Sequence, residues 1–328
     1  SFARMSPAAS FSQRWAAHNL SRPASPEELT TLNLILATSD NEEQASKRAR
    51  SYYTARGPGG LTELWHKRHP DDEDILSSCQ DAHIVPLKSR RLDGRRMTIV
   101  RLPAPTAQTR SISARALLAR WLMILDIRLR EDPTPGDEVV FVDVSDLQPS
   151  HLKNHFKGTY WKDFIWCMKH AYPHRFTEIH IINTERIKTV SLLLLHIGLY
   201  PWRRKVHIHS HSDHLTDAEE YFPIEGLPYE YGGKAGAMKD LNDEWTKKLL
   251  SNSKWLASEE RKFYNTDLKP APRSRLRHKS AIRPLRSNGS YDMITRTHSC
   301  KSLHRQDDIE DAMYGDYRTL RLGSERLF

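Results

Sequence analysis

The stretch Glu178-Ile-His-Ile-Ile-Asn183 is short and mostly apolar, as expected of a buried β-strand. Soon after it the chain runs Thr189-Val-Ser-Leu-Leu-Leu-Leu-His-Ile-Gly-Leu-Tyr200, with apolar residues at nearly every helical position. A helix without a polar face is either fully buried or lies between apolar surfaces on two sides. The sequence therefore predicts a buried strand followed by a helix that differs from an ordinary surface helix.

Strands and helices alternate on both sides of this stretch. Hydrophobic spacing predicts strands at 97–102, 139–144, 179–182 and 206–210, and helices at 113–130, 149–171, 187–200 and 239–257. The run Val139-Val-Phe-Val-Asp-Val144 is typical of a strand that is covered on both faces. This alternation predicts an α/β fold with a mainly parallel sheet flanked by helices.

Charge and composition divide the chain. The net charge is +9, and residues 269–305 hold ten Lys and Arg against the single acid Asp292. We expect a disordered leader (1–26), an all-helical N-terminal unit (27–90), an α/β domain (91–258) and a disordered basic tail (259–328). Two interpretations of the tail stay open: it attracts acidic membranes or nucleic acid, or it is a solubilising extension.

Several classes of protein are disfavoured by the sequence. The three cysteines form no CxxC pair, which argues against a disulfide scaffold and for a reducing compartment. The longest apolar stretch, Val190–Trp202, is too short to span a bilayer. Nucleotide-binding, hydrolase and metalloprotease signatures are absent, so we expect no catalytic residues and no cofactor.

Four histidines near one another raise the possibility of a metal site. His207, His209 and His211 share one face of a predicted strand, and His214 follows. No Cys or Glu stands at ligand spacing beside them, so no metal is predicted.

Six segments together resemble the CRAL-TRIO lipid-binding family, in particular its tocopherol-transfer and retinaldehyde-binding branch. They keep the family's order over residues 45 to 250, and they are Phe141-Val-Asp-Val-Ser-Asp-Leu147, Ser150-His-Leu152, Ala171-Tyr-Pro173, Ile179-His-Ile-Ile-Asn183, Val206-His-Ile-His209 and Leu227-Pro-Tyr-Glu-Tyr-Gly-Gly233. The resemblance implies one apolar cavity between the sheet and its helices.

The resemblance also implies which residues line that cavity. By matching helices and strands, the lining residues are Leu118, Trp121, Leu122, Leu125, Phe141, Phe164, Cys167, Met168 and Ile181, and the gate helix over the cavity carries Val190, Leu193, Leu194 and Ile197. Each is explained equally well as ordinary core. Trp121 and Leu125 stand where relatives place small polar residues, which indicates a more apolar ligand.

Cations near the gate complete the implied site. In relatives, basic residues at the positions of Arg175, Arg203, Arg204 and Lys205 bind phosphoinositide head groups beside the gate. A helix end exposed to solvent explains the same residues equally well. The family's Arg-rich helix is replaced here by Leu34-Ile-Leu-Ala-Thr-Ser39, which removes basic partners.

The resulting prediction is a monomeric, non-enzymatic lipid-transfer protein of the cytoplasm that associates peripherally with membranes. Its partners would be a small hydrophobic ligand (retinoid, tocopherol-like or phospholipid) and an anionic membrane surface that includes phosphatidylinositol phosphates. Nucleic acid is not expected as a partner. The alternative is a protein-interaction module in membrane trafficking or signalling.

Overall fold

The computed structural model describes residues 10–58, 60–104, 113–147, 159–184, 206–209, 224–265 and 268–269. All of them belong to one compact unit, Ser1–Pro272. The predicted gate helix, the cluster Arg203, Arg204 and Lys205, the first part of the helix at 149–171 and the basic tail after residue 269 lie outside the described residues.

The leader expected to be disordered over residues 1–26 contains a helix, α1 (Phe11–Asn19). Ser10 begins it with a capping box, in which side chain and backbone bond reciprocally. Trp15 is buried, and its ring stacks on Tyr53 with the centroids 5.4 Å apart. The prediction was wrong for this stretch because aromatic burial against another helix offsets the polar composition.

The remaining N-terminal helices are α2 (Pro26–Ala37), α3 (Glu42–Arg56), α4 (Thr62–Trp65) and α5 (Glu73–Asp81). A second capping box at Ser25 begins α2, with Pro26 at the first helical position. α2 ends at Ala37, and α3 begins at Glu42 after the cap formed by Asn41. Apolar side chains of α1, α2 and α3 share one core with Phe263 of a later helix.

The described part of the chain forms a five-stranded sheet in the order β1-β2-β3-β4-β5. Its strands are β1 (His83–Pro86), β2 (Arg96–Arg101), β3 (Glu138–Asp143), β4 (Phe176–Ile182) and β5 (Val206–Ile208). β1 pairs antiparallel with β2, and all other pairs are parallel. The predicted α/β fold with a mainly parallel sheet is therefore confirmed.

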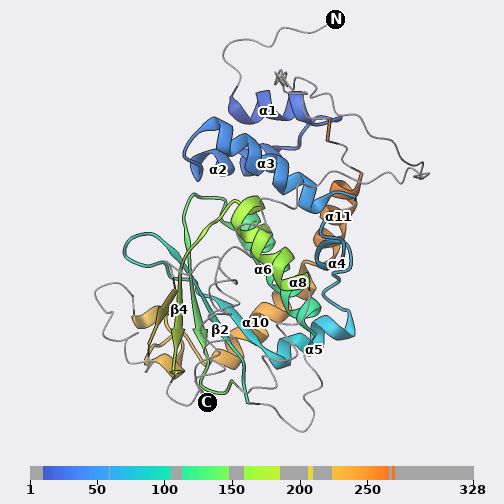
Figure 1. The fold of residues 1–328 in the computed structure, drawn as a ribbon. Coiled ribbons are helices and arrows are strands. Elements are labelled where there is room, and N and C mark those ends of the chain that lie inside the picture. Colours follow the sequence, from blue (N-terminus) through green and yellow to red (C-terminus); the bar gives the residue numbers. More distant parts are fainter. Residues whose placement is uncertain are drawn as a thin grey trace, which may run out of the picture. The chain divides into compact units, whose positions relative to one another are not determined.

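Helices cover the sheet on both faces (Figure 1). They are α6 (Ala114–Glu131), α8 (Thr159–Trp166), the π-helix η1 (Cys167–Ala171), α10 (Met238–Ser251) and α11 (Ser253–Tyr264). Val100, Val140 and Ile179 face α6 and α8. The alternate positions, such as Ile99 and Phe141, pack toward α10.

Two elements differ from the sequence prediction. β1 was not expected, because four residues that end in Pro86 show neither helical nor strand periodicity. The helix predicted at 239–257 is two helices, because the Asn252 side chain donates to the carbonyl of Lys248 and ends α10.

The turn Leu227–Gly233 closes over the α10 face of the sheet. Gly232 has a φ of 76°, a conformation that favours glycine. A Cβ on Gly233 would lie 1.9 Å from the carbonyl oxygen of Leu227, so no other residue fits there. The Tyr231 hydroxyl donates to Asp143 at the end of β3, at 2.7 Å. The turn is therefore fixed to the carboxyl end of the sheet.

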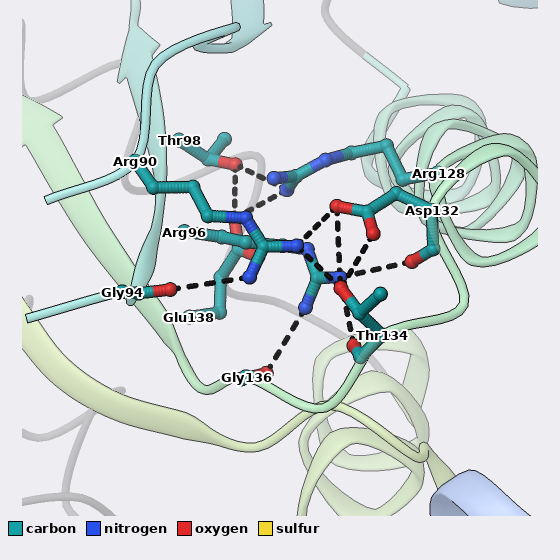
Figure 2. A network of polar contacts seen from close by, with 9 residues as sticks. All are labelled: Arg90, Gly94, Arg96, Thr98, Arg128, Asp132, Thr134, Gly136 and Glu138. Carbon is teal, nitrogen blue, oxygen red and sulfur yellow. Dashed lines mark hydrogen bonds and ion pairs between the residues drawn. The ribbon is translucent and has the colours of Figure 1, made fainter.

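An arginine network holds the opposite end of the sheet, where the strands begin (Figure 2). Arg96 donates to the backbone carbonyl of Asp132 at 2.9 Å and pairs with its carboxylate at 3.0 Å. Arg90 bonds the same carboxylate. Arg128 pairs with the buried Glu138 at 2.5 Å. The end of α6 is thereby attached to the starts of β2 and β3.

Candidate functional site

An apolar layer between α6 and the sheet lies where the cavity was predicted. Every residue of α6 from Ala116 to Ile127 is buried, so the middle of this helix has no solvent-facing side. Seven of the predicted lining residues share the single apolar cluster of this layer: Leu118, Trp121, Leu122, Leu125, Phe164, Cys167 and Met168. The apolar face that α6 turns toward α8 and the sheet is a favourable wall for an apolar ligand.

The other two predicted lining residues are not members of this cluster. Phe141 points to the opposite face of the sheet, where it stacks on His180 with the ring centroids 4.7 Å apart. Ile181 lies on the same face of the sheet as Ile179 and packs with Val144 at the carboxyl end, where Val142 and Val206 also contact the apolar layer. Alternation along β3 separates Phe141 from Val140 and Val142, so Phe141 and the α6 residues cannot line the same side of the sheet.

Trp121 gives the layer one polar group. Its ring packs against Phe164 and Phe176, with centroids 5.1 and 5.8 Å away. Its indole N–H is buried and has no hydrogen-bond acceptor. The neighbouring Cys167 thiol is also buried, which raises its pKa to about 11, so the thiol is protonated and unreactive at neutral pH.

A buried carboxylate anchors α6 from its other side. One oxygen of Asp126 accepts from Arg56 at 3.1 Å and from the Tyr172 hydroxyl at 2.7 Å, and the other lies 2.7 Å from Arg68. The Arg56 guanidinium also lies over the Tyr52 ring, 3.5 Å from its centroid. Sequence reasoning missed this cluster, although an acid inside the apolar stripe of a helix signals a buried partner.

Residues 81–233 match a family model described as CRAL/TRIO domain. The chain carries a CRAL/TRIO domain. The resemblance to the CRAL-TRIO family is thereby confirmed, whereas the match does not distinguish between branches of the family. CRAL/TRIO domains in general bind and transfer lipophilic ligands. The match includes β1, so the CRAL/TRIO domain begins before residue 91, while α10 and α11 lie beyond its end.

Arg175 is the one predicted membrane-binding cation that the structure describes. It precedes β4 in the CRAL/TRIO domain, and its Nε lies 3.3 Å from an oxygen of Asp137. Its side chain stays 40% exposed, so the guanidinium can still meet a second anion. None of the described helices is both long enough and apolar enough to cross a bilayer.

Histidines gather at the β5 edge of the CRAL/TRIO domain. The His180 ring stacks with those of His207 and His209, at centroid distances of 4.8 and 5.2 Å. Burial lowers the pKa of His180 to about 4, so its ring is neutral at pH 7. Among the residues that the structure describes, no three or more His, Cys, Asp or Glu are arranged to hold a metal ion; His211 and His214 lie outside them.

A half-open pocket of about 180 Å³ lies between α2, α3, α6 and α11, outside the apolar layer. It is smaller than the roughly 300–1,000 Å³ of typical ligand sites. Charged residues on its walls already pair, as Glu28 does with Arg22 at 2.9 Å and Glu259 with Lys262 at 3.2 Å. This pocket therefore does not suit an apolar ligand.

Proposed function

We propose that the apolar layer of the CRAL/TRIO domain opens to hold one small lipophilic ligand, and that the protein carries this ligand between membranes. The burial of α6 supports the proposal, because its side chains meet α8 and the sheet in one continuous apolar cluster. Each Å² of hydrocarbon that leaves water there contributes about 25 cal/mol. The ligand would be a retinoid, a tocopherol-like compound or a phospholipid, and no bond is made or broken.

The segment 187–200 is proposed to be the gate, with Val190, Leu193, Leu194 and Ile197 facing the ligand and, during exchange, the membrane. Moving a lipid from bilayer to protein exchanges one apolar environment for another, so the driving forces nearly cancel. A gate that is apolar on both faces adds no desolvation barrier to either state.

A cationic rim is proposed to hold the gate against an anionic leaflet. Arg175, Arg203, Arg204 and Lys205 would each contribute roughly 1 kcal/mol near such a surface, and phosphatidylinositol phosphates would strengthen the contact. The protein would then act as a monomer on the cytoplasmic side of membranes.

Native mass spectrometry of the purified full chain tests ligand binding. We expect a lipid bound at a ratio of one per chain, released when the protein unfolds. A chain that carries no lipid and takes up none from vesicles would contradict the proposal and would favour the protein-interaction module instead.

A vesicle-to-vesicle transfer assay with a fluorescent retinoid tests the gate. Replacing Leu194 and Ile197 by Asp should reduce the transfer rate at least tenfold, because two charges must then be desolvated at the membrane. Leu250→Asp is the matched control, since Leu250 is exposed on α10. Equal transfer rates for the gate variant and the control would refute the gate assignment.

A further inference from the structure

Thr134 is an exposed threonine between two prolines, in the loop that joins α6 to β3. Pro133 and Pro135 are exposed as well, and neither has a backbone N–H that a hydrogen bond could hold in place. A residue that precedes proline favours the extended region, which is the conformation in which protein kinases bind a substrate segment. Thr134 therefore has the accessibility and the flanking sequence of a kinase substrate.

Pro135 directly follows the threonine, as the proline-directed class of protein kinases requires. The sequence contains two further pairs of this kind, Ser6-Pro7 and Ser25-Pro26, and the first of them lies outside the described residues. Ser25 is only partly exposed, and its hydroxyl begins α2 by accepting from the backbone N–H of Glu28 at 3.3 Å. Thr134 is thus the more accessible of the two pairs that the structure describes.

Two guanidinium groups already meet the Thr134 hydroxyl oxygen (Figure 2). Nη2 of Arg90 lies 2.6 Å from this oxygen, and Nη2 of Arg96 lies 3.2 Å from it. The hydroxyl in turn donates to Asp132 at 2.5 Å. A phosphate on this oxygen would carry a charge of about −1.5 to −2, and arginine binds phosphate oxygens well. Both cations are therefore in place before the phosphate is added.

Asp132 is the anion that pairs with both arginines in the unmodified chain. Its side chain is 42% exposed, so the carboxylate can turn into water when a phosphate repels it. Arg96 stays in place without this carboxylate, because its Nη2 also donates to the backbone carbonyls of Asp132 and Thr134, at 2.9 and 2.8 Å. The two arginines would therefore exchange an exposed carboxylate for a phosphate of higher charge.

The loop lies at the end of the sheet where the parallel strands begin, which is also the place of Arg175 in the proposed cationic rim. The ring of His174 is hydrogen-bonded to the backbone of Thr134. Arg175 follows His174 directly and pairs with Asp137 of the same loop at 3.3 Å. A phosphate on Thr134 would thus add negative charge beside Arg175 and oppose its attraction for an anionic leaflet.

We propose that a proline-directed protein kinase phosphorylates Thr134, that Arg90 and Arg96 bind the phosphate, and that the added charge weakens the attraction of the protein for anionic membranes. In the reaction the Thr134 hydroxyl oxygen bonds to the γ-phosphorus of ATP, the bond from this phosphorus to the ADP oxygen breaks, and the hydroxyl proton passes to a base of the kinase. The first two parts stand by themselves, and only the third rests on the proposed function.

Labelling by a kinase tests the site. The folded full chain is incubated with ATP and, in turn, with a cyclin-dependent kinase and a MAP kinase, and mass spectrometry of peptides locates the phosphate. We expect Thr134 to be modified in the wild type and in Ser25→Ala, and not in Pro135→Ala, which keeps the hydroxyl. A Thr134 that both kinases leave unmodified, or that is modified equally fast in Pro135→Ala, would overturn the inference.

Phosphorus NMR of the labelled chain tests the arginine contacts. Arg90 and Arg96 should lower the second pKa of the phosphate from about 6 to about 5, because a nearby cation favours the dianion. Arg90→Met should raise this pKa again. Lys88→Met is the matched control and should leave the pKa unchanged, since Lys88 is an exposed cation that pairs with Glu244. One pKa shared by all three chains would overturn the inference.

Co-sedimentation with phosphatidylcholine vesicles that contain phosphatidylserine tests the effect on membranes. The phosphorylated chain should bind roughly 5- to 30-fold more weakly than the unmodified chain, since each charge near such a surface changes the affinity about fivefold. Equal binding of the two forms would overturn the third part while the proposed function stands. An unmodified chain that does not bind these vesicles would overturn the third part together with the proposed cationic rim, while labelling and NMR still decide the first two parts.

Discussion

Replacing Asp126 by Asn should destabilise the protein strongly. The carboxylate is the shared partner of Arg56 and Arg68, which are both buried, and it accepts the Tyr172 hydroxyl. The neutral amide would leave two guanidinium groups without a counter-charge. Breaking a buried ion pair by removing one partner costs about 3–5 kcal/mol, and here a single substitution affects two pairs.

Thermal unfolding, followed by tryptophan fluorescence and circular dichroism, measures this loss. At roughly 2–4 °C per kcal/mol for a chain of this size, the melting temperature should fall by about 6–20 °C. Glu43→Gln is the control, because its pair with Lys47 lies on the surface of α3, and its midpoint should match the wild type.

A compensating substitution should restore the stability of the Asp126 variant. Replacing Arg56, Arg68 and Asp126 together by Met, Met and Leu removes the charges along with their partner, and should recover most of the stability lost by Asp126→Asn. A loss below about 1 kcal/mol for Asp126→Asn would refute the idea that this carboxylate holds the two arginines.

Further predictions follow from other contacts. Because burial lowers the pKa of His180 to about 4 and of His174 to about 3, the unfolded chain binds more protons below pH 6.5. The free energy of unfolding should therefore fall by roughly 2–3 kcal/mol between pH 7.5 and 5.5, and His174→Asn should flatten this dependence; a flat wild-type profile would contradict it. Trp15→Ala should cost about 3–5 kcal/mol, whereas a disordered leader would show no change. The Cys167 thiol should react with a disulfide reagent only after unfolding, since rapid reaction of the folded chain would mean that the layer is open to water. Gly233→Ala should destabilise the turn because its Cβ meets the Leu227 carbonyl, and an unchanged midpoint would show that the turn adjusts.

The fold could largely be predicted because its signals are local. The apolar run of β3 and the stripe of α6 each report burial within a single element. β1 was not predicted, because a strand of four residues that ends in proline is too short to show a hydrophobic period. α1 was not predicted, because its burial depends on a contact between Trp15 and Tyr53, a residue of another helix.

The site was less predictable because it depends on which face of an element a side chain occupies. Phe141 was assigned to the cavity by its motif, yet strand alternation already places it opposite Val140. Asp126 interrupts the apolar stripe of α6. Its ion-pair partners Arg56 and Arg68 come from before the CRAL/TRIO match.

The Asp126 cluster has a consequence for how such a chain can change over generations. Its carboxylate belongs to the CRAL/TRIO match, while Arg56 and Arg68 precede residue 81. Recombination at the start of the match would separate Asp126 from Arg56 and Arg68, and would leave buried charges without partners in both resulting chains. We therefore expect the helices before the match and the domain after it to depend on one another for stability, and a change in any one of these side chains to require a matching change in the others.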